Sequence, residues 1–248
     1  MAHDLAVVFL HGIMGPEFIL RLWPRFEYFR GVRAALSGLK VPLHFPLSPS
    51  GATLEQRAAR LAGALDAIPA DGLCLVGHSM GGLDGRYLIH HHDPQRRIRA
   101  LATLGSPHRG SPLVEWAMHT QGPVQWFARR FLVPGIHQLT PEACARFNQA
   151  VPDRGDVRYL SWAGVRPVAE MPRLYREPAR VLQTLEGDND SQVSLASARW
   201  GEFRGTVRAD HLELTGWSLG LPDRRHARPF DHLSLFREVV PALLEAAR

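Results

Sequence analysis

Lysine is almost absent from this sequence. Lys40 is the only lysine among 29 basic residues, which leaves 29 − 1 = 28 arginines. The formal net charge is +5, but the arginines are scattered and form neither a basic stripe nor a recognised nucleic-acid-binding motif. The charge therefore does not indicate a nucleic-acid partner, and it is compatible with transient contact with an anionic lipid surface.

Cysteine and long apolar runs are scarce as well. Cys74 and Cys144 are too few for a disulfide framework. The sequence has no stretch of about 18 consecutive apolar residues, the usual pattern of a transmembrane helix. Residues 1–4 lead directly into an apolar run, without the basic region, apolar segment and cleavage site of a secretory signal. We therefore expect a cytoplasmic protein without a transmembrane segment.

Internal repeats, low-complexity tracts and linker-like stretches are also missing. The chain has 248 residues, 45% of them hydrophobic, and is long enough to bury a full core. We expect residues 1–248 to form a single domain.

The most informative stretch is residues 73–86. An apolar run, 73–76, has the length of a buried strand, and apolar residues at helical spacing follow Gly77-His78-Ser79-Met80-Gly81. Strand, G-x-S-x-G and helix make up the nucleophile elbow, in which a serine sits on a strained turn above a sheet. The glycines two residues before and after the serine let the strand and the helix approach closely. Ser79 is therefore the predicted nucleophile.

A second signal follows the first apolar run, 5–10. His11-Gly12 comes directly after it, at the position where a hydrolase loop brings a backbone N–H to the carbonyl under attack. We expect the backbone amides of Ile13 and Met80 to form the oxyanion hole. Each motif is common by itself, but the two together, one strand–helix unit apart, favour a hydrolase.

Strand and helix patterns alternate along most of the chain. This alternation predicts an α/β fold of the hydrolase type, with a mostly parallel central sheet flanked by helices. Three consecutive histidines, 90–92, point in different directions on a helix, so we interpret them as a solvated helix end rather than a metal site. The predicted strands are 5–10, 41–47, 73–76, 98–104, 157–163 and 203–207. Five helices are predicted: one that ends at 39, one over 53–65 with Thr53 as N-cap, one that follows residue 81, one that ends at 182 and one that begins near 231.

Residues 112–150 interrupt the alternation. They contain no strand pattern, and they combine large apolar side chains such as Trp126 and Phe127 with Arg129 and Arg130. Hydrolases carry a helical cap or lid at this point of the chain. We therefore expect 112–150 to be a cap or lid insertion that contacts lipid or a hydrophobic acyl chain, with an ordinary helix pair packed on the sheet as the alternative.

An activated serine needs a base, and the base needs a carboxylate that orients it. In α/β hydrolases the order is Ser, Asp or Glu, His, each on a loop at the C-terminal edge of the sheet. Asp190 lies where the acid loop is expected. Asp188 and Glu186 are the alternatives.

The base is expected between the last strand and the last helix, where His211 lies. His226 and His232 also lie before or at that helix. Alternatively, His232 is a first-turn residue of the terminal helix, with Asp231 as its N-cap. His78 is part of the elbow, and His11 is part of the loop after the first predicted strand, residues 11–13, which we call the oxyanion loop. Neither histidine is therefore expected to be the base.

In the predicted mechanism His211 takes the proton of Ser79, and the serine oxygen attacks an ester carbonyl. The amides of Ile13 and Met80 stabilise the tetrahedral oxyanion, and water later hydrolyses the acyl-enzyme.

Short sequence blocks extend these motifs. In chain order they are Val-Phe-Leu-His-Gly at 8–12, Gly-His-Ser-Met-Gly-Gly at 77–82, Leu-Gly-Ser-Pro-His-Arg-Gly-Ser at 104–111, Leu-Thr-Pro-Glu at 139–142, Phe-Asn at 147–148, Tyr-Leu-Ser-Trp at 159–162, Asn-Asp at 189–190, Val-Ser at 193–194 and Asp-His-Leu at 210–212. In these blocks and their order the chain resembles the bacterial triacylglycerol lipases and related esterases of the α/β-hydrolase superfamily. The resemblance covers most of the chain, and it implies that Asp190 and His211 complete the triad.

The sequence departs from that family in three respects. Those lipases are typically secreted, whereas no signal peptide is expected here, so extracellular fat is not an expected substrate. Many hold a structural calcium ion partly through an aspartate two residues after the catalytic histidine, where this chain has Glu213 and no identified second carboxylate. The family's usual disulfide has no recognisable counterpart. We expect no required cofactor and no metal site, with a structural calcium ion as the alternative.

Together the motifs predict a serine carboxylic ester hydrolase, a lipase or esterase, whose substrate is a small-molecule or lipid ester with a hydrophobic acyl group. A second interpretation is an acyltransferase or polyester depolymerase with the same triad. A third is a catalytically silent hydrolase fold that binds lipid or protein, although a binding module would not need to retain serine, acid and base together.

Overall fold

Six strands form one parallel sheet, in the order β2-β1-β3-β4-β5-β6. The computed structural model describes residues 3–13, 26–120, 122, 133–218 and 230–248. All neighbouring strands of the sheet are parallel, which confirms the predicted α/β-hydrolase-type sheet. The strands are β1 (His3–Leu10), β2 (Leu43–His44), β3 (Ala70–His78), β4 (Ile98–Leu104), β5 (Arg158–Gly164) and β6 (Glu202–Val207).

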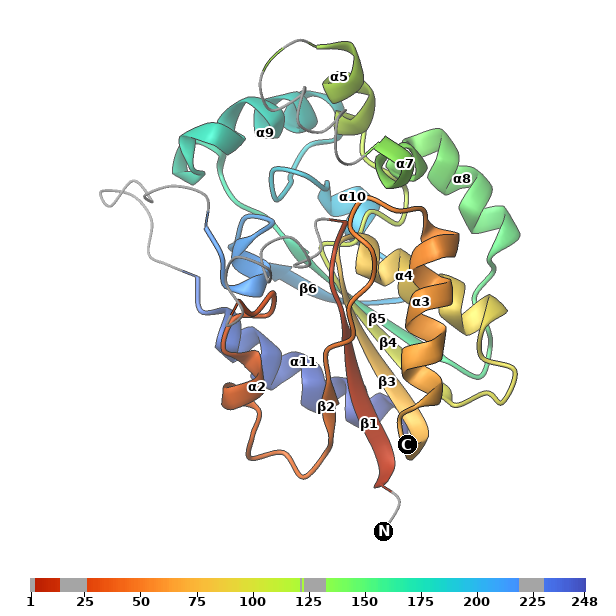
Figure 1. The fold of residues 1–248 in the computed structure, drawn as a ribbon. Coiled ribbons are helices and arrows are strands. Elements are labelled where there is room, and N and C mark those ends of the chain that lie inside the picture. The colour runs from red at the N-terminus through yellow and green to blue at the C-terminus, as the bar shows by residue number, and fades with distance from the viewer. Residues whose placement is uncertain (1–2, 14–25, 121, 123–132, 219–229) are drawn as a thin grey trace.

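Helices cover both faces of this sheet (Figure 1). The α-helices of the described residues are α2 (Val32–Ala35), α3 (Leu54–Asp66), α4 (Met80–His91), α5 (Leu113–His119), α7 (Val133–Ile136), α8 (Pro141–Ala150), α9 (Arg173–Glu186), α10 (Leu195–Ala198) and α11 (His232–Ala246). Short 3₁₀ segments are η1 (His137–Leu139), η2 (Val168–Glu170) and η3 (Glu213–Thr215). Helices α2 and α11 pack on one face, and α3 and α4 pack on the other.

The side chains of β1 alternate between two hydrophobic cores. Val7 and Phe9 belong to the core beneath α11, whereas Ala6, Val8 and Leu10 belong to the core beneath α3 and α4. Successive side chains of a strand point to opposite faces, so a strand covered on both sides must be apolar throughout. The continuous apolar runs therefore form β1 and β3, and the residues after these strands reach the C-terminal edge of the sheet together.

Two helices begin as the sequence predicts. The Thr53 side chain accepts a hydrogen bond from the N–H of Gln56, and the Gln56 side chain accepts one from the N–H of Thr53. This capping box fixes the start of α3. The Asp231 carboxylate accepts from the N–H of Ser234, so Asp231 is the N-cap of α11 and His232 lies in its first turn.

The predicted strand at 41–47 is wrong in length. Only Leu43–His44 form β2, which pairs with β1 at the edge of the sheet. Pro42 and Pro46 flank this pair, and a proline has no N–H for a sheet ladder. The helix expected to end at 39 is likewise reduced to Val32–Ala35, and part of the segment before it, residues 14–25, lies outside the described residues.

The described part of 112–150 is helical and consists of α5, α7, η1 and α8. Residues 121 and 123–132 lie outside it, so the expected lid remains a prediction. No described helix combines the length and apolar character needed to span a membrane.

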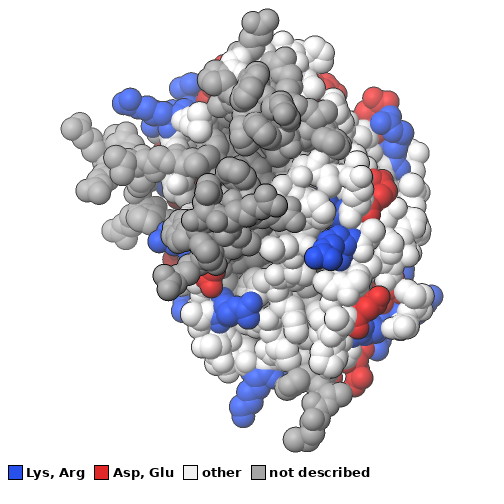
Figure 2. All heavy atoms as spheres, viewed as in Figure 1, with Lys and Arg blue, Asp and Glu red and all other residues white. Residues whose placement is uncertain are grey.

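Charged side chains are dispersed on the face drawn in Figure 2. Basic and acidic groups are interspersed there, with uncharged surface between them. The described part of this face has no continuous basic band, in agreement with the scattering of arginines along the sequence.

Candidate active site

Ser79 occupies the turn between β3 and α4. Its backbone has φ 55° and ψ −130°, a conformation that side-chain-bearing residues rarely adopt. Neighbouring glycines allow the turn: a Cβ on Gly77 would lie 2.6 Å from Gly82 Cα, and one on Gly81 would lie 2.2 Å from Leu10 O. The strain predicted for a nucleophile elbow is present at the predicted serine.

Asp190 and His211 are brought together by two hydrogen bonds. His211 Nδ1 donates to Asp190 Oδ2 at 2.7 Å, and the N–H of His211 donates to the carbonyl of Asp190 at 2.8 Å. The other carboxylate oxygen, Oδ1, accepts from the N–H groups of Gln192 and Val193. A proton on Nδ1 leaves Nε2 of His211 as the basic nitrogen.

The alternatives for acid and base lie elsewhere. Asp188 and Glu186 are exposed, whereas Asp190 is only 1% exposed and contacts His211. Nε2 of His232 donates to the carbonyl of Arg30 at 2.7 Å. His226 lies outside the described residues. The geometry therefore favours Asp190 and His211 as the acid and the base.

The Ser79 hydroxyl lies beside the loop that follows β1. A Cβ on Gly12 would lie 3.4 Å from Ser79 Oγ, so the loop after β1 passes directly beside the serine. The ring of His78, the residue before the serine, lies 4.6 Å from the ring of His211, centroid to centroid. Among the hydrogen bonds between described residues, none joins Ser79 Oγ to His211. Such bonds are often long in a free enzyme and shorten when substrate binds.

The backbone of the oxyanion loop is oriented by its own histidine. His11 Nδ1 donates to the carbonyl of Gly12 at 2.8 Å, while His11 Nε2 accepts from the N–H of Ser48. In a trans peptide the C=O and N–H point in opposite directions, so the N–H of Ile13 is turned away from His11. Burial and the nearby Arg57 charge lower the pKa of His11 to about 3, which keeps its ring neutral.

Met80 supplies the second predicted oxyanion donor. It is the first residue of α4, where backbone N–H groups have no partner within the helix. The backbone hydrogen bonds of the described residues include none in which the N–H of Ile13 or of Met80 donates. The N–H groups of Ile13 and Met80 thus remain the predicted oxyanion donors.

A buried ion pair that no sequence motif indicates lies behind the oxyanion loop. Arg57 of α3 and Asp84 of α4 are both fully buried, with Arg57 Nη2 2.6 Å from Asp84 Oδ2. The same nitrogen donates to the carbonyl of His11 at 2.7 Å, so the pair holds the loop against both helices. Burial raises the pKa of Asp84, and the guanidinium opposes that rise. An arginine three residues after Leu54, on the apolar face of α3, was the signal that could have revealed it.

Residues 48–231 match the alpha/beta hydrolase fold family. The chain belongs to that family. Triacylglycerol lipase 2 of Saccharomyces cerevisiae (strain ATCC 204508 / S288c) is 30% identical to it over 211 residues, which are 79% of this chain and 64% of that protein. The chain thus spans less than two thirds of the length of that curated relative.

Solved α/β-hydrolase structures share the fold. Bacillus licheniformis lipase BlEst2 in its mature form has a TM-score of 0.75 and 19% identity, covering 96% of this chain and 91% of that one. The metagenomic carboxyl esterase MGS0156 has a TM-score of 0.73 and 21% identity, with coverage of 99% and 75%. Staphylococcus hyicus lipase has a TM-score of 0.74 and 14% identity, with coverage of 98% and 96%. These structures, all at most 21% identical to the chain, show the shared fold. The family match and the relative described as a triacylglycerol lipase confirm the predicted resemblance to lipases and esterases of the superfamily.

Glu213 stands where the resemblance implies a calcium ligand. Its carboxylate instead accepts hydrogen bonds from the Arg166 guanidinium and from the N–H of Asp210. Asp210 Oδ1 accepts from the N–H groups of Leu212 and Glu213. In the part of the chain that the structure describes, no three His, Cys, Asp or Glu side chains gather as a metal ion would require. The positive charge beside Glu213 is the guanidinium of Arg166, so Glu213 and Asp210 do not fit a calcium ion.

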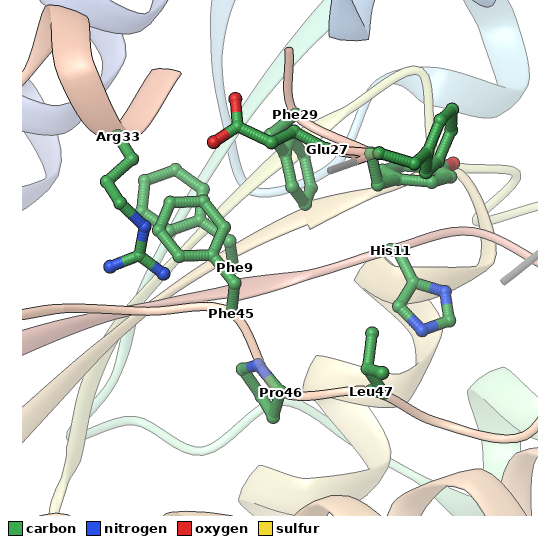
Figure 3. Close-up of a pocket in the computed structure, with 10 residues that line it drawn as sticks. Phe9, His11, Glu27, Phe29, Arg33, Phe45, Pro46 and Leu47 are labelled. Carbon is green, nitrogen blue, oxygen red and sulfur yellow. The ribbon is translucent and has the colours of Figure 1, made fainter. Parts of the chain in front are cut away.

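A cavity of about 230 Å³ lies beside the oxyanion loop, between β1 and the segment before α2 (Figure 3). Its wall is largely aromatic, and the Arg33 guanidinium lies over the Phe45 ring, 4.4 Å from its centroid. His11 contributes to this wall, but Ser79 does not. The cavity therefore adjoins the oxyanion loop without opening onto the serine.

Proposed function

We propose that the protein is a serine carboxylic ester hydrolase that cleaves esters with a hydrophobic acyl group through an acyl-enzyme on Ser79. The observation that carries this proposal is the buried Asp190–His211 hydrogen bond at the same sheet edge as a serine in the elbow conformation. Membership of the α/β-hydrolase fold family and the similarity to proteins described as lipases and esterases support it.

The first half of the reaction forms the acyl-enzyme. His211 Nε2 takes the proton of Ser79 Oγ, and that oxygen forms a bond to the ester carbonyl carbon. The N–H groups of Ile13 and Met80 stabilise the resulting oxyanion. The bond to the alkoxy oxygen then breaks, and the imidazolium gives its proton to the leaving alcohol.

The second half releases the acid. A water molecule gives a proton to His211 Nε2 as its oxygen attacks the acyl carbon, and the same two amides stabilise the second oxyanion. Collapse of this intermediate returns the proton to Ser79 Oγ and releases the carboxylic acid. Asp190 keeps Nδ1 protonated in both halves, so Nε2 accepts and donates in turn.

The hydrophobic acyl preference is part of the proposal, as is a cytoplasmic location. Among the described residues of 112–150, Val114 and Leu139 share a hydrophobic cluster with Met80. We propose that residues 112–150 contact the acyl chain or, transiently, a lipid surface. A series of esters with increasing acyl chain length therefore tests this part of the proposal.

The test compares wild type with Ser79→Ala on p-nitrophenyl esters from acetyl to palmitoyl. We expect wild-type turnover that varies along the series and falls roughly 10⁴- to 10⁶-fold in the variant. Ser106→Ala is a matched control, because the Ser106 hydroxyl is buried without a hydrogen-bond partner in the described residues. That variant is expected to retain activity.

Two outcomes would contradict the proposal. Turnover that survives in Ser79→Ala would exclude Ser79 as the nucleophile. An inactive wild type across the series would favour a binding function or an ester class outside it. Transesterified product on addition of an alcohol would instead indicate acyl transfer with the same serine.

A further inference from the structure

A continuous chain of hydrogen bonds joins the oxyanion loop to the loop that carries His211. The N–H of Gly12 donates to Tyr28 Oη at 3.0 Å, and Tyr28 Oη lies 2.8 Å from His78 Nδ1. His78 Nε2 lies 2.9 Å from the carbonyl oxygen of His211. The linked residues come from four separate parts of the sequence and converge at one edge of the sheet.

The direction of each bond follows from the groups at its two ends. A carbonyl only accepts, so His78 Nε2 must carry a hydrogen and donate to His211. A neutral imidazole then has an unprotonated Nδ1, which accepts the Tyr28 hydroxyl proton. The Tyr28 oxygen in turn accepts from Gly12. Every donor in the chain has one acceptor, and only one tautomer of His78 satisfies all of them.

The surroundings of His78 keep it neutral. It is fully buried, and burial lowers its pKa well below 6.5, with the His211 and His11 rings nearby acting in the same direction. A charged ring there would repel the imidazolium that His211 must become during the reaction, because the two rings are 4.6 Å apart. The chain of bonds thus places a neutral partner against the proposed base.

Close packing makes this arrangement sensitive to small displacements. A Cβ on Gly12 would lie 2.8 Å from Tyr28 Oη and 3.0 Å from Ser79 Cβ, so the oxyanion loop lies directly between the tyrosine and the serine. The Gly12 carbonyl is already held by His11, and the His11 carbonyl by Arg57. The bond to Tyr28 therefore connects an otherwise fixed loop to the opposite side of the site.

We propose that Tyr28 and His78 are positioning residues that set the oxyanion donors and the base His211 at a fixed separation. This inference rests on the proposed hydrolase function. Neither side chain needs to touch the substrate: Tyr28 acts through the Gly12 backbone, and His78 acts through the His211 backbone. The middle residue of the elbow motif thereby has a role of its own, distinct from that of the serine beside it.

The first test is Tyr28→Phe, with Tyr159→Phe as its matched control. Tyr159 Oη also accepts one backbone N–H, that of Arg154, at 3.0 Å, and burial raises the pKa of both tyrosines to about 12. We expect similar losses of thermal stability in the two variants. Tyr28→Phe should lower kcat by roughly 10- to 100-fold with little change in KM, since small displacements of reacting groups cost about that much. Tyr159→Phe should leave kcat within about twofold of wild type.

A double-variant cycle tests whether the two residues act as one unit. His78→Gln retains an N–H donor for the His211 carbonyl, whereas His78→Leu retains none, so the glutamine variant should keep more activity. If the hydrogen-bonded residues act as one unit, the double variant Tyr28→Phe/His78→Leu should lower kcat little more than the more damaging single variant does. Multiplicative effects on kcat would overturn the proposal, as would equal effects of Tyr28→Phe and Tyr159→Phe.

A spectroscopic measurement separates this inference from the proposed function. In ¹⁵N-histidine NMR of the wild-type protein, we expect His78 to carry its proton on Nε2 and to remain neutral well below pH 6.5, because burial lowers its pKa. Tyr28→Phe should alter the Nδ1 shift of His78. A proton on Nδ1 of wild-type His78 would contradict the proposal even in an active enzyme. If the wild-type protein hydrolyses no ester but shows the expected tautomer, the proposed function fails while the hydrogen-bonded chain stands.

Discussion

Two buried serines have positive φ, one in the turn of the proposed nucleophile and one in the loop of the proposed acid. Ser79 has φ 55° in the elbow, and Ser191 has φ 85° in the loop of the proposed acid. At Ser79 the conformation is held by packing, because backbone atoms of β1 and α4 leave no room for a Cβ on Gly77 or Gly81. At Ser191 it is held by side chains, since Asn189 Oδ1 accepts the Ser191 N–H.

The two methods of support leave different traces in a sequence. Packing of glycines around a turn is local and produces a short recognisable motif. Support by side-chain hydrogen bonds distributes the requirement over several polar residues, each common by itself. The serine side of the site is therefore easy to predict, while the acid–base side needs the order of several blocks.

The largest effect predicted for the acid–base side is a loss of kcat. Asp190→Asn should lower kcat by about 10⁴-fold, because an amide facing His211 favours the wrong tautomer of its ring. Asp188→Asn, on an exposed neighbour, is the control and should change kcat by less than about twofold. Steady-state kinetics on one p-nitrophenyl ester measures both. Equal losses in the two variants would contradict the assignment of the acid.

Substitutions of the glycines packed around the Ser79 turn should act mainly on the stability of the fold. A Cβ on Gly81 would lie 2.2 Å from Leu10 O, so Gly81→Ala should destabilise the fold by about 3 kcal/mol. Gly63→Ala in α3 is the matched control, because nothing lies within 4 Å of its added Cβ. That substitution should stabilise the fold by about 0.5–1 kcal/mol, since alanine favours a helix. Urea denaturation followed by circular dichroism would reveal whether the two changes have opposite signs.

A pH-dependent effect is expected from Asp210, beside the proposed base. Burial and the neighbouring Glu213 raise the pKa of Asp210 to about 7 from its usual 3.8, and its Oδ2 is buried without a partner in the described residues. The folded state therefore holds a proton that the unfolded state has lost between about pH 4 and 7, so this group reduces stability as pH rises through that window.

Asp210→Asn removes the ionisable group, so the loss of stability that this group causes at higher pH should disappear. We expect it to raise the free energy of unfolding by about 2 kcal/mol at pH 8, half of the roughly 4 kcal/mol that a three-unit shift represents. At pH 4 its effect should be small. Denaturation at both pH values measures the difference, and an equal change at pH 4 and pH 8 would exclude titration of Asp210 as the cause.

The smallest predicted change is in stability, and it separates the backbone strain at Ser79 and Ser191 from the role of Ser79 in hydrolysis. Glycine adopts positive φ freely, so Ser79→Gly and Ser191→Gly should each stabilise the fold by about 1 kcal/mol. The Ser191 hydroxyl is buried with no partner in the described chain, so its removal costs no hydrogen bond. Only Ser79→Gly should abolish ester hydrolysis. Loss of activity in both variants would show that the acid loop depends on its serine as the elbow does.

The sequence allowed the parallel α/β sheet, the elbow and both cap residues to be predicted because these depend on patterns within a few residues or on their alternation along the chain. The short β2 was not predicted, since its length depends on two prolines at a sheet edge. Tyr28 was not singled out either, because its partners Gly12 and His78 are 16 and 50 residues away. Hydrogen bonds between such distant residues leave no periodic signal along the chain.

The ion pairs were missed for a related reason. Arg57 and Asp84 lie 27 residues apart, and Arg166 and Glu213 lie 47 apart. In a chain with 28 arginines among its 29 basic residues, one arginine has no distinguishing composition. The calcium alternative drawn from the family resemblance depended on Glu213, and only the folded structure brings Arg166 to it.

Trapping the acyl-enzyme tests the role of Ser79 as nucleophile directly. Wild-type protein is mixed with a p-nitrophenyl ester, quenched in acid within the first turnover and digested for mass spectrometry. Acyl-enzyme formation on Ser79 predicts one acyl group per chain on the peptide that contains Ser79, lost on treatment with hydroxylamine and absent from Ser79→Ala. Turnover with the acyl group on another residue, or with undiminished rate in Ser79→Ala, would contradict it.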